Sequence, residues 1–583
     1  MKSLNLHSDA NPQPQTVRTP PKSPLIQTPQ SGSTTQDLQK LIKYHSKHSK
    51  SVLRLGLPYK GAREFYGSHQ QTQISHSKAI TKILIQSSQA STSLALIGNP
   101  PDRPNRLPPL NLHYPLPSLQ SLQNITNINL PLILYPNNNP HRTKLLSHTL
   151  TSLKRLTRVS LEISHPLHDN EIHSILRSLC RLPSLSHLAI TFSTFQLTSC
   201  LFQLLALYIS KLSHLKGLIL HFTDHRTHVE LADLSPIFAN LPLLSEFSLK
   251  LAHTAGSRAE AVISFLESLG TLKLLSKLHL EITEKTEIFN TERNLVSMNL
   301  GKLNLSSLRE LSLRFDWCYS DTALLNLSSS LKEFSSLKAM NLDLSKCRYI
   351  TEKSVSQLAL DLEQLLNLSR LALTFPREGR DTHPMMKAFS QNLSSLTGLN
   401  DLTLNFSKCP QESVDSVEVF SSSLEKLTGL KSLALIFRGN ETITDQTLEL
   451  LMKGVEKLEG LASLKIDLRG LEVRNEAVQA IESSLSQLQN LKDLKLGFDS
   501  VSLKAVASIV KRLHSLYSIE LKNSEYVKSD FDFFLDVSKD LVNLRKINLL
   551  FASAPKLEEI EVGSLKHQKC VAISKMEDDE DDF

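Results

Sequence analysis

The sequence lacks the short motifs that many nucleotide-binding proteins and hydrolases need. It has no GxxxxGK[ST] loop for nucleotide phosphates, no HExxH zinc motif and no GxSxG serine-nucleophile motif. Its 21 histidines are scattered, and isolated ones such as His187 and His214 are typical of surface or structural positions. We therefore expect a chain that is not an enzyme and that needs no cofactor.

Cysteine is scarce, and its spacing does not fit a metal site. The six cysteines are Cys180, Cys200, Cys318, Cys347, Cys409 and Cys570. They form no CxxC pair and no Cys/His cluster, so we expect no metal centre. Six cysteines in 583 residues do not make a disulfide framework either, and we expect reduced thiols.

Long apolar runs are absent as well. No stretch approaches 18 uninterrupted apolar residues, and the N-terminus MKSLNLHSDANPQPQ has no apolar signal-peptide core. Together with reduced cysteines, this predicts a cytoplasmic or nuclear protein that is not secreted and has no transmembrane segment.

Net charge is small, but the charges are unevenly placed. The first 150 residues hold 16 Lys and Arg against 4 Asp and Glu, whereas the last seven residues, EDDEDDF, hold six acids. Within the basic part, residues 37–66 interleave seven Lys and Arg with aromatic residues. If nucleic acid or an acidic surface is a partner, we expect contact only through this segment. The alternative is a solvated basic arm.

One phrase recurs along most of the chain. LTGLNDLTLNFSK begins at Leu396 and LTGLKSLALIFRG at Leu427, and both follow the pattern L-x-x-L-x-x-L-x-L-x-F/L. Such self-similarity at a period of about 30 residues predicts a solenoid. Fifteen copies begin at Leu122, Leu153, Leu182, Leu212, Leu241, Leu272, Leu305, Phe334, Leu365, Leu396, Leu427, Leu458, Leu488, Leu513 and Leu541.

Each copy has a strand half and a helix half. The apolar residues of LNDLTLNF alternate, as in a strand with one buried face. In TDQTLELLMKGVEKL they recur at helical spacing, and the same stripe appears near residue 355. Thr351 and Thr444 stand where a hydroxyl can cap the following helix. Alternating strands and helices predict a parallel sheet with helices packed on one side.

The strand phrase resembles the leucine-rich repeat, and the helix in each copy resembles the ribonuclease-inhibitor type of that family. The resemblance implies an α/β leucine-rich-repeat solenoid: a curved horseshoe with a parallel sheet on the concave side and helices on the convex side. The position where the family usually has Asn or Cys is occupied here by Ser345, Pro376, Ser407, Arg438, Arg469 and Asp499. We therefore expect no ladder of buried Asn side chains between repeats.

The expected organisation has four parts. Residues 1–36 form a disordered tail rich in Pro, Ser, Thr and Gln. Residues 37–115 are a basic flank and an irregular lead-in that caps the first repeat. Residues 116–560 are the solenoid of about 15 repeats, and residues 561–583 are a C-terminal tail that ends in the acidic run.

The residues between the inward leucines should face outward across the concave surface. Their charges alternate from one copy to the next, which predicts either lateral pairing within the sheet or a docking patch for a mixed-charge partner. Trp317 and Tyr319 follow a strand, and exposed aromatic residues dominate many binding sites. The candidate partner-binding residues are Lys277, Glu281, Glu310, Arg314, Trp317, Tyr319, Asp343 and Arg370.

Three Ser/Thr-Pro sites lie in the N-terminal tail. In VRTPPKSPLIQTP, the residues Thr19, Ser23 and Thr28 each precede a proline, and TPPK resembles the substrate motif of cyclin-dependent kinases. We treat these three as candidate phosphorylation sites. A phosphate adds about −1.5 to −2 charge to this basic segment.

The sequence favours a non-enzymatic scaffold or adaptor that binds a protein partner of unknown identity through the concave face of the repeats. Two alternatives stay open. One is a substrate receptor of a ubiquitin ligase, which often places a small helical domain before its repeats. The other is a GTPase-activating protein of the Ran type, which this chain resembles in its ribonuclease-inhibitor-like repeats and acidic C-terminus.

Overall fold

The structure is a computed structural model that describes a large part of the chain. Its described residues fall into two compact units, an N-terminal unit (residues 53–283) and a C-terminal unit (residues 300–575). Both units repeat the predicted alternation of strand and helix. The described residues are 53–56, 93–97, 126–132, 140–163, 168–193, 199–223, 231–251, 259–283, 300–303, 305–315, 321–347, 349–377, 384–409, 413–499, 501–523, 527–551 and 570–575.

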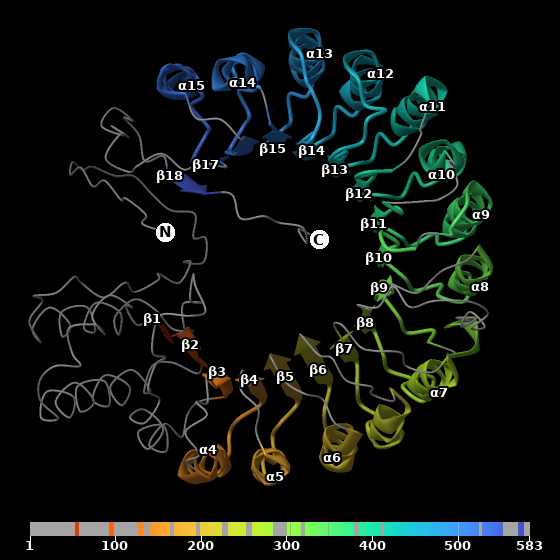
Figure 1. The fold of residues 1–583 in the computed structure, drawn as a ribbon, viewed down its shortest axis with the longest axis vertical. Helices are drawn as coiled ribbons and strands as arrows, with labels where there is room; N and C mark the ends of the chain where they lie inside the picture. Colours follow the sequence, from red (N-terminus) through yellow and green to blue (C-terminus); the bar gives the residue numbers. More distant parts are fainter. Residues whose placement is uncertain are drawn as a thin grey trace, which may run out of the picture. The chain divides into compact units, whose positions relative to one another are not determined.

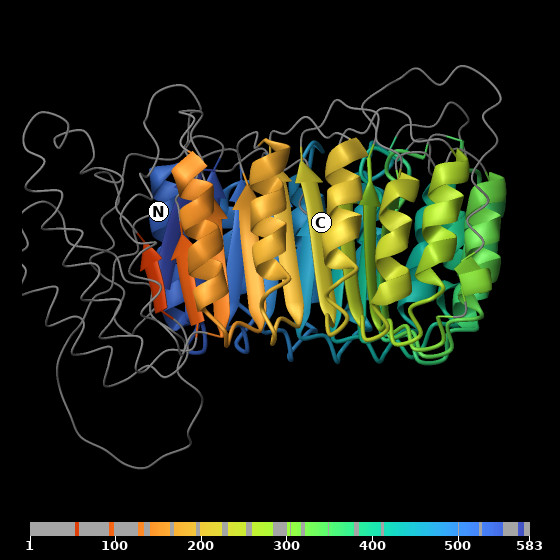
Figure 2. The same cartoon turned by 90° about the horizontal axis from the view of Figure 1, so that it is seen from below.

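The N-terminal unit is a parallel sheet covered on one side by helices. Figure 1 shows its strands on the inner side of the unit's own curve and its helices on the outer side, and Figure 2 shows the helices standing side by side in front of the strands. Each strand from β1 to β7 pairs in parallel with the next. The elements are β1 (Leu53–Gly56), β2 (Ser93–Ile97), β3 (Asn127–Leu132), α4 (Pro140–Ser152), β4 (Arg158–Ile163), α5 (Asp169–Leu179), β5 (His187–Ser193), α6 (Ser199–Ile209), β6 (Gly217–Thr223), η3 (Leu231–Asn240), β7 (Glu246–Leu251), α7 (Ala259–Leu269) and β8 (Lys277–Ile282).

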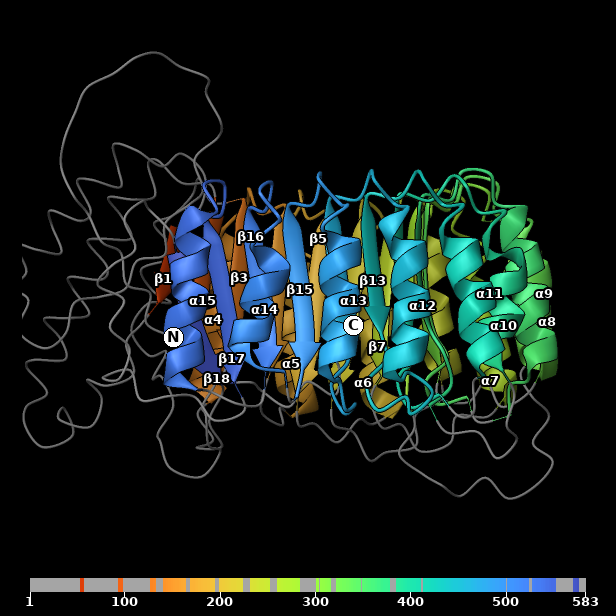
Figure 3. The same ribbon diagram turned by 90° about the horizontal axis from the view of Figure 1, so that it is seen from above.

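The C-terminal unit has the same construction, and Figure 3 shows its later helices side by side outside the strands. Each strand from β9 to β17 again pairs in parallel with its successor. The elements are η4 (Leu300–Leu303), β9 (Glu310–Phe315), α8 (Asp321–Leu331), β10 (Ala339–Asp343), α9 (Glu352–Glu363), β11 (Arg370–Thr374), α10 (Met385–Leu393), β12 (Asp401–Asn405), α11 (Val414–Leu424), β13 (Ser432–Ile436), α12 (Asp445–Glu456), β14 (Ser463–Asp467), α13 (Asn475–Leu485), β15 (Asp493–Phe498), α14 (Leu503–Val510), β16 (Ser518–Asn523), α15 (Lys528–Asp540), β17 (Lys546–Phe551) and β18 (Cys570–Lys575).

The fifteen predicted strands are confirmed as β3 to β17, one within the second half of each copy of the phrase. The sheets extend beyond the expected limits of residues 116 and 560, however. β1 and β2 fall within the segment that we expected to be an irregular lead-in, and β18 falls within the expected C-terminal tail. These strands depart from the full phrase. β1 reads LRLG, in which apolar residues alternate, and β18 reads CVAISK, which begins with a short apolar run. Either pattern is compatible with a strand in a parallel sheet.

The helix half of the repeat is less uniform than predicted. Between β6 and β7 the chain forms the 3₁₀ helix η3 instead of an α-helix, and Pro236 lies inside it. A proline in a helix has no backbone N–H to donate and clashes with the preceding turn, so the regular α-helical pattern is not sustained there. Elsewhere the predicted caps are confirmed: the Thr351 side chain accepts from the Lys353 backbone N–H, and the Thr444 side chain from that of Thr447.

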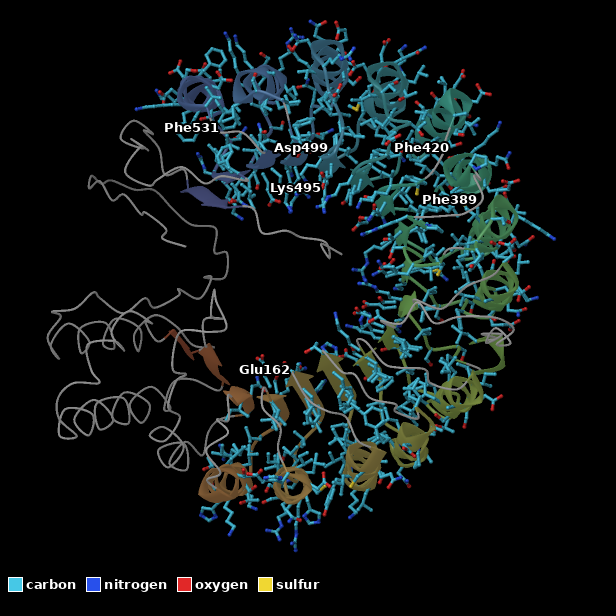
Figure 4. All side chains as sticks on the ribbon, viewed as in Figure 1. Glu162, Phe389, Phe420, Lys495, Asp499 and Phe531 are labelled. Carbon is cyan, nitrogen blue, oxygen red and sulfur yellow. The ribbon has the colours of Figure 1, made fainter. Side chains whose placement is uncertain are left out.

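The core lies between the sheet and the helices. Inward leucines such as Leu402 and Leu404 are fully buried, as the alternation predicts. Behind them runs a row of aromatic rings: Phe406 stacks on Phe375 at 4.4 Å between ring centroids and on Phe437 at 5.8 Å. Figure 4 shows Phe389 and Phe420 in the same layer between strands and helices. The apolar core is therefore continuous along the repeats of this unit.

Buried polar side chains also link successive repeats, which corrects our expectation about the Asn position. The Nδ2 group of Asn440 donates to the Phe406 carbonyl at 2.9 Å, and the thiol of Cys409 donates to the Pro376 carbonyl at 3.2 Å. Both side chains are buried. They lie two residues after the aligned positions Arg438 and Ser407, so single bonds of this kind occur at a position that our alignment missed. The corresponding residues of the next two repeats are Leu471 and Val501, which cannot make such a bond, so these contacts do not form a continuous ladder of Asn side chains.

We predict that Gly454→Ala destabilises the protein. Alanine is about 1 kcal/mol more favourable than glycine inside an ordinary helix. In α12, however, a Cβ at this position would lie 2.5 Å from the backbone oxygen of Ser421 in α11. The two helices must move apart, so we expect the free energy of unfolding to fall by about 1–3 kcal/mol, measured by urea denaturation. Lys453→Ala, on the exposed side of the same helix, is the control, and a more stable Gly454→Ala protein would contradict the prediction.

Candidate functional site

On the inner side of each sheet, which no helix covers, three side chains of each strand point away from the apolar core. We call these positions outward. In β4, for example, the burial of successive residues alternates, and Arg158, Ser160 and Glu162 point away from the core. Figure 4 places Glu162 of the N-terminal unit and Lys495 of the C-terminal unit on the inner side of their strands. Because the strands pair in register, each outward position forms a column across its unit.

The candidate residues of the N-terminal unit are paired laterally. Lys250 of β7 contacts Glu281 of β8 at 3.1 Å, and Lys277 of β8 contacts Glu246 of β7 at 3.4 Å. Lateral pairing across neighbouring strands, one of the two predicted outcomes, is therefore observed here. The Lys277–Glu246 pair is exposed, and pairs of that kind contribute about 0–1 kcal/mol, so it compensates charge more than it stabilises the fold. The Glu281 carboxylate is largely buried beneath its pair with Lys250.

The candidate residues of the C-terminal unit are paired in the same way. The Arg314 guanidinium contacts the Asp343 carboxylate at 3.2 Å across β9 and β10. Arg370 of β11 reaches two strands away to Glu310 of β9, also at 3.2 Å, over the small side chain of Ala339 in β10. The described candidates thus form two separate sets, one in each unit, and each set is engaged in its own ion pairs.

Several predicted sites lie outside the residues that the structure describes. Trp317 and Tyr319 follow β9 in an undescribed stretch, and the candidate phosphorylation sites Thr19, Ser23 and Thr28 are likewise not described. Of the basic segment 37–66, only the backbone of β1 is described. These remain predictions.

The sequence did not reveal a cluster around Asp467, which is the last residue of β14. Its side chain is only 3% exposed, and its Oδ2 accepts from the Nε of Arg438 at 2.7 Å. Arg469 donates to the same carboxylate twice, at 2.9 Å from Nε and at 2.8 Å from Nη2. The two arginines follow consecutive strands 31 residues apart, and this recurrence is the only sequence signal that points to them.

The surroundings of Asp467 are crowded and basic. Gly497 lies next to it in β15, and a Cβ there would approach Asp467 Oδ1 to 2.5 Å, so the carboxylate occupies space that only glycine leaves open. Burial raises the pKa of Asp467 above its ordinary value, while Arg438, Lys465 and Lys522 pull it in the opposite direction. A single buried carboxylate therefore holds several cations together on the inner face of the sheet.

A second polar cluster lies on the inner face of the N-terminal unit. His221 Nε2 lies 3.1 Å from the Ser248 hydroxyl, and His279 Nε2 lies 3.9 Å from the paired Glu281 carboxylate. Burial lowers the pKa of His221, and its neighbours His279 and Lys250 lower it further, while Glu281 opposes the shift. Burial also lowers the pKa of His279, although Glu281 opposes the shift. Both imidazoles are therefore kept neutral near pH 7.

The described part of the chain shows no group of three or more His, Cys, Asp and Glu side chains that could hold a metal ion. Cys180, Cys200, Cys347 and Cys409, four cysteines of the described part, are not in disulfide bonds. No helix among the described residues is long and apolar enough to cross a membrane.

We predict that the stability of the protein falls as the pH drops below about 6.5, the ordinary pKa of histidine. Folded His221 and His279 resist protonation, so the unfolded chain binds more protons below that pH, and stability is lost as the pH falls towards the folded pKa values. The double substitution of His221 and His279 by Gln should flatten the decline in urea midpoint between pH 7 and pH 5. His214→Gln, at an exposed position, is the control, and an unchanged slope in the double variant would count against this account.

We predict that Asp467→Asn lowers the free energy of unfolding by about 1–3 kcal/mol, because Arg438 and Arg469 lose the carboxylate that accepts their hydrogen bonds. Urea denaturation followed by circular dichroism measures the change. Asp493→Asn, at an exposed position of the neighbouring strand, is the matched control. Equal stability of the Asp467→Asn variant and the wild type would mean that removing the buried charge offsets the lost hydrogen bonds.

Comparisons with known proteins identify a solved structure with a similar fold, but they identify no protein family. No protein-family model matches the chain, and no curated protein matches it. Among solved structures, one that it resembles is the crystal structure of the Rad7 and Elc1 complex in yeast, with 13% sequence identity and a TM-score of 0.35. That match covers 85% of this chain and 94% of the other. At this identity and TM-score the likeness carries no argument about function.

Proposed function

We propose that this chain is a leucine-rich-repeat protein that acts as a non-enzymatic scaffold and binds a protein partner across the inner face of its parallel strands. The observation that carries the proposal is the register of that face. In the C-terminal unit, β9 to β17 pair residue for residue, so their outward side chains form continuous columns on a rigid backbone. A fixed surface of this kind binds with little loss of conformational entropy.

The polar groups of the inner face support binding more than catalysis. An active site usually brings polar groups together in a cavity that excludes water. Here the charged side chains stand on neighbouring strands of an open sheet and pair sideways, as Arg314 does with Asp343 and Lys495 with Glu520. A partner can exchange the more exposed of these pairs, such as Lys495 with Glu520, for its own at little net cost.

Charge reversal on the two sides of one unit tests the proposal. Arg370 and Lys495 on the inner face are 55% and 51% exposed, and Lys453 on the outer side of α12 is 58% exposed. Partners captured from native lysate by the full chain are identified by mass spectrometry, and their affinity for each purified variant is then measured. We expect Arg370→Glu or Lys495→Glu to weaken the inner-face partner at least tenfold, about 1.4 kcal/mol, and Lys453→Glu to leave it unchanged.

Other outcomes are equally informative. A partner that binds both inner-face variants at full strength would place recognition elsewhere and contradict the proposal. Recovery of ubiquitin-ligase subunits would favour the substrate-receptor alternative. Accelerated GTP hydrolysis by a Ran-type GTPase in the presence of the chain would show an activity that a pure scaffold does not have.

A further inference from the structure

The inner face of the C-terminal unit changes in charge along its length. From β14 to β17 it carries a group of cations that we call the basic strip: Lys465, Lys495, Lys522 and Lys546 on the strands, with Arg438 and Arg469 on the turns after β13 and β14. The acids among them are Asp467, Asp493, Asp499 and Glu520. The strip therefore has more positive than negative charge, whatever pairs its members form.

Three of the four acids of the strip are already engaged, and the fourth, Asp493, is exposed at the start of β15. Asp467 is shared by Arg438 and Arg469, Glu520 lies 3.4 Å from Lys495, and Asp499 accepts from the Gly470 backbone N–H at 2.5 Å. Lys495 remains half exposed despite its pair. A surplus of positive charge on a rigid face attracts a negatively charged segment, and the attraction falls with increasing salt.

The strongest negative segment of this sequence begins next to the strip. β18 pairs in parallel with β17, and the register runs across three strands from Lys522 to Leu550 to Ser574. The chain therefore leaves β18 at the edge of the sheet where Asp467 ends β14 and where Lys522 lies one residue before the end of β16. Lys575 and Met576 follow, and then the acidic run Glu577–Asp582.

The distances allow the run to cover the strip. Neighbouring strands lie about 4.8 Å apart, so β16 is roughly 10 Å and β14 roughly 19 Å from β18. About seven residues beyond Lys575 can span up to about 25 Å when extended. The carboxylates of the run can therefore reach every strand of the strip, and the covalent connection gives an effective concentration in the millimolar range.

We propose that the acidic run Glu577–Asp582 binds the basic strip of its own chain and covers this end of the inner face. The run then competes with any acidic segment of a partner. This consequence rests on the proposed function, because it concerns regulation of the same face. The contact itself does not depend on the partner.

A labelled peptide of sequence MEDDEDDF tests the proposal. Its affinity is measured by fluorescence anisotropy for the full wild-type chain and for the full chain in which Glu577–Asp582 are changed to Gln and Asn. We expect the peptide to bind the neutralised chain at least tenfold more tightly, because its site is no longer occupied. Adding Lys495→Gln and Lys546→Gln, both at exposed positions, should weaken that binding at least tenfold, and adding Lys453→Gln should not.

Zero-length carbodiimide cross-linking locates the run directly. On the wild-type chain we expect cross-links from Glu577–Asp582 to lysines of the basic strip, lost at high salt. Equal peptide affinity for the wild-type and neutralised chains, or no binding to either, would overturn the proposal. Cross-links found only between isotope-labelled and unlabelled copies would also overturn it, because the run would then bind a second molecule. None of these readouts involves a partner, so the proposed function stands or fails separately.

Discussion

The arrangement of both units depends on one forked backbone hydrogen bond that recurs in successive repeats. A single carbonyl just before a strand accepts from two consecutive N–H groups of the following repeat. In the C-terminal unit, the Ser369 carbonyl accepts from the backbone N–H groups of Asn400 and Asp401 at 2.8 and 3.0 Å. In the N-terminal unit, the Thr157 carbonyl accepts from those of Ser186 and His187 at 2.9 and 3.0 Å. Where the fork is present, as before β5 and β12, it sets the first residue of the strand, so it decides at once which side chains enter the core and which form the outward columns.

The outward columns are consequently free to vary, and their charges give the two ends of the C-terminal unit different character. Around β9 to β11 the charges compensate one another through Arg314 with Asp343 and Arg370 with Glu310. From β14 onward the same backbone carries more cations than acids. A buried carboxylate is needed to hold Arg438 and Arg469 in place, and the raised pKa of Asp467 shows that its burial outweighs the stabilising effect of the neighbouring cations.

The strands and caps could be predicted because they depend on local patterns. Alternating leucines and a threonine before a helix act within a few residues, and both were found where expected. Contacts between repeats were harder to predict from the sequence. Our alignment of the repeats was displaced by two residues, so it did not identify the buried hydrogen bond of Asn440. The cluster at Asp467 needs Gly497 and two arginines from different turns, which no single repeat contains. The site therefore depends on register, which only the structure supplies.

Repetition also limits how far a change on the inner face can act. In a solenoid each repeat contacts its neighbours, so an altered outward residue affects adjacent strands and leaves distant ones as they were. The turn of the phrase LTGL shows how closely successive repeats pack. A Cβ at Gly429 would lie 3.3 Å from the Thr397 carbonyl of the preceding repeat. At the equivalent turn of a later repeat, the Asn490 side chain donates to the Glu459 carbonyl of the preceding repeat at 2.9 Å. Close contact at this edge keeps the strands in place, so charge on the open face can change without loss of the fold.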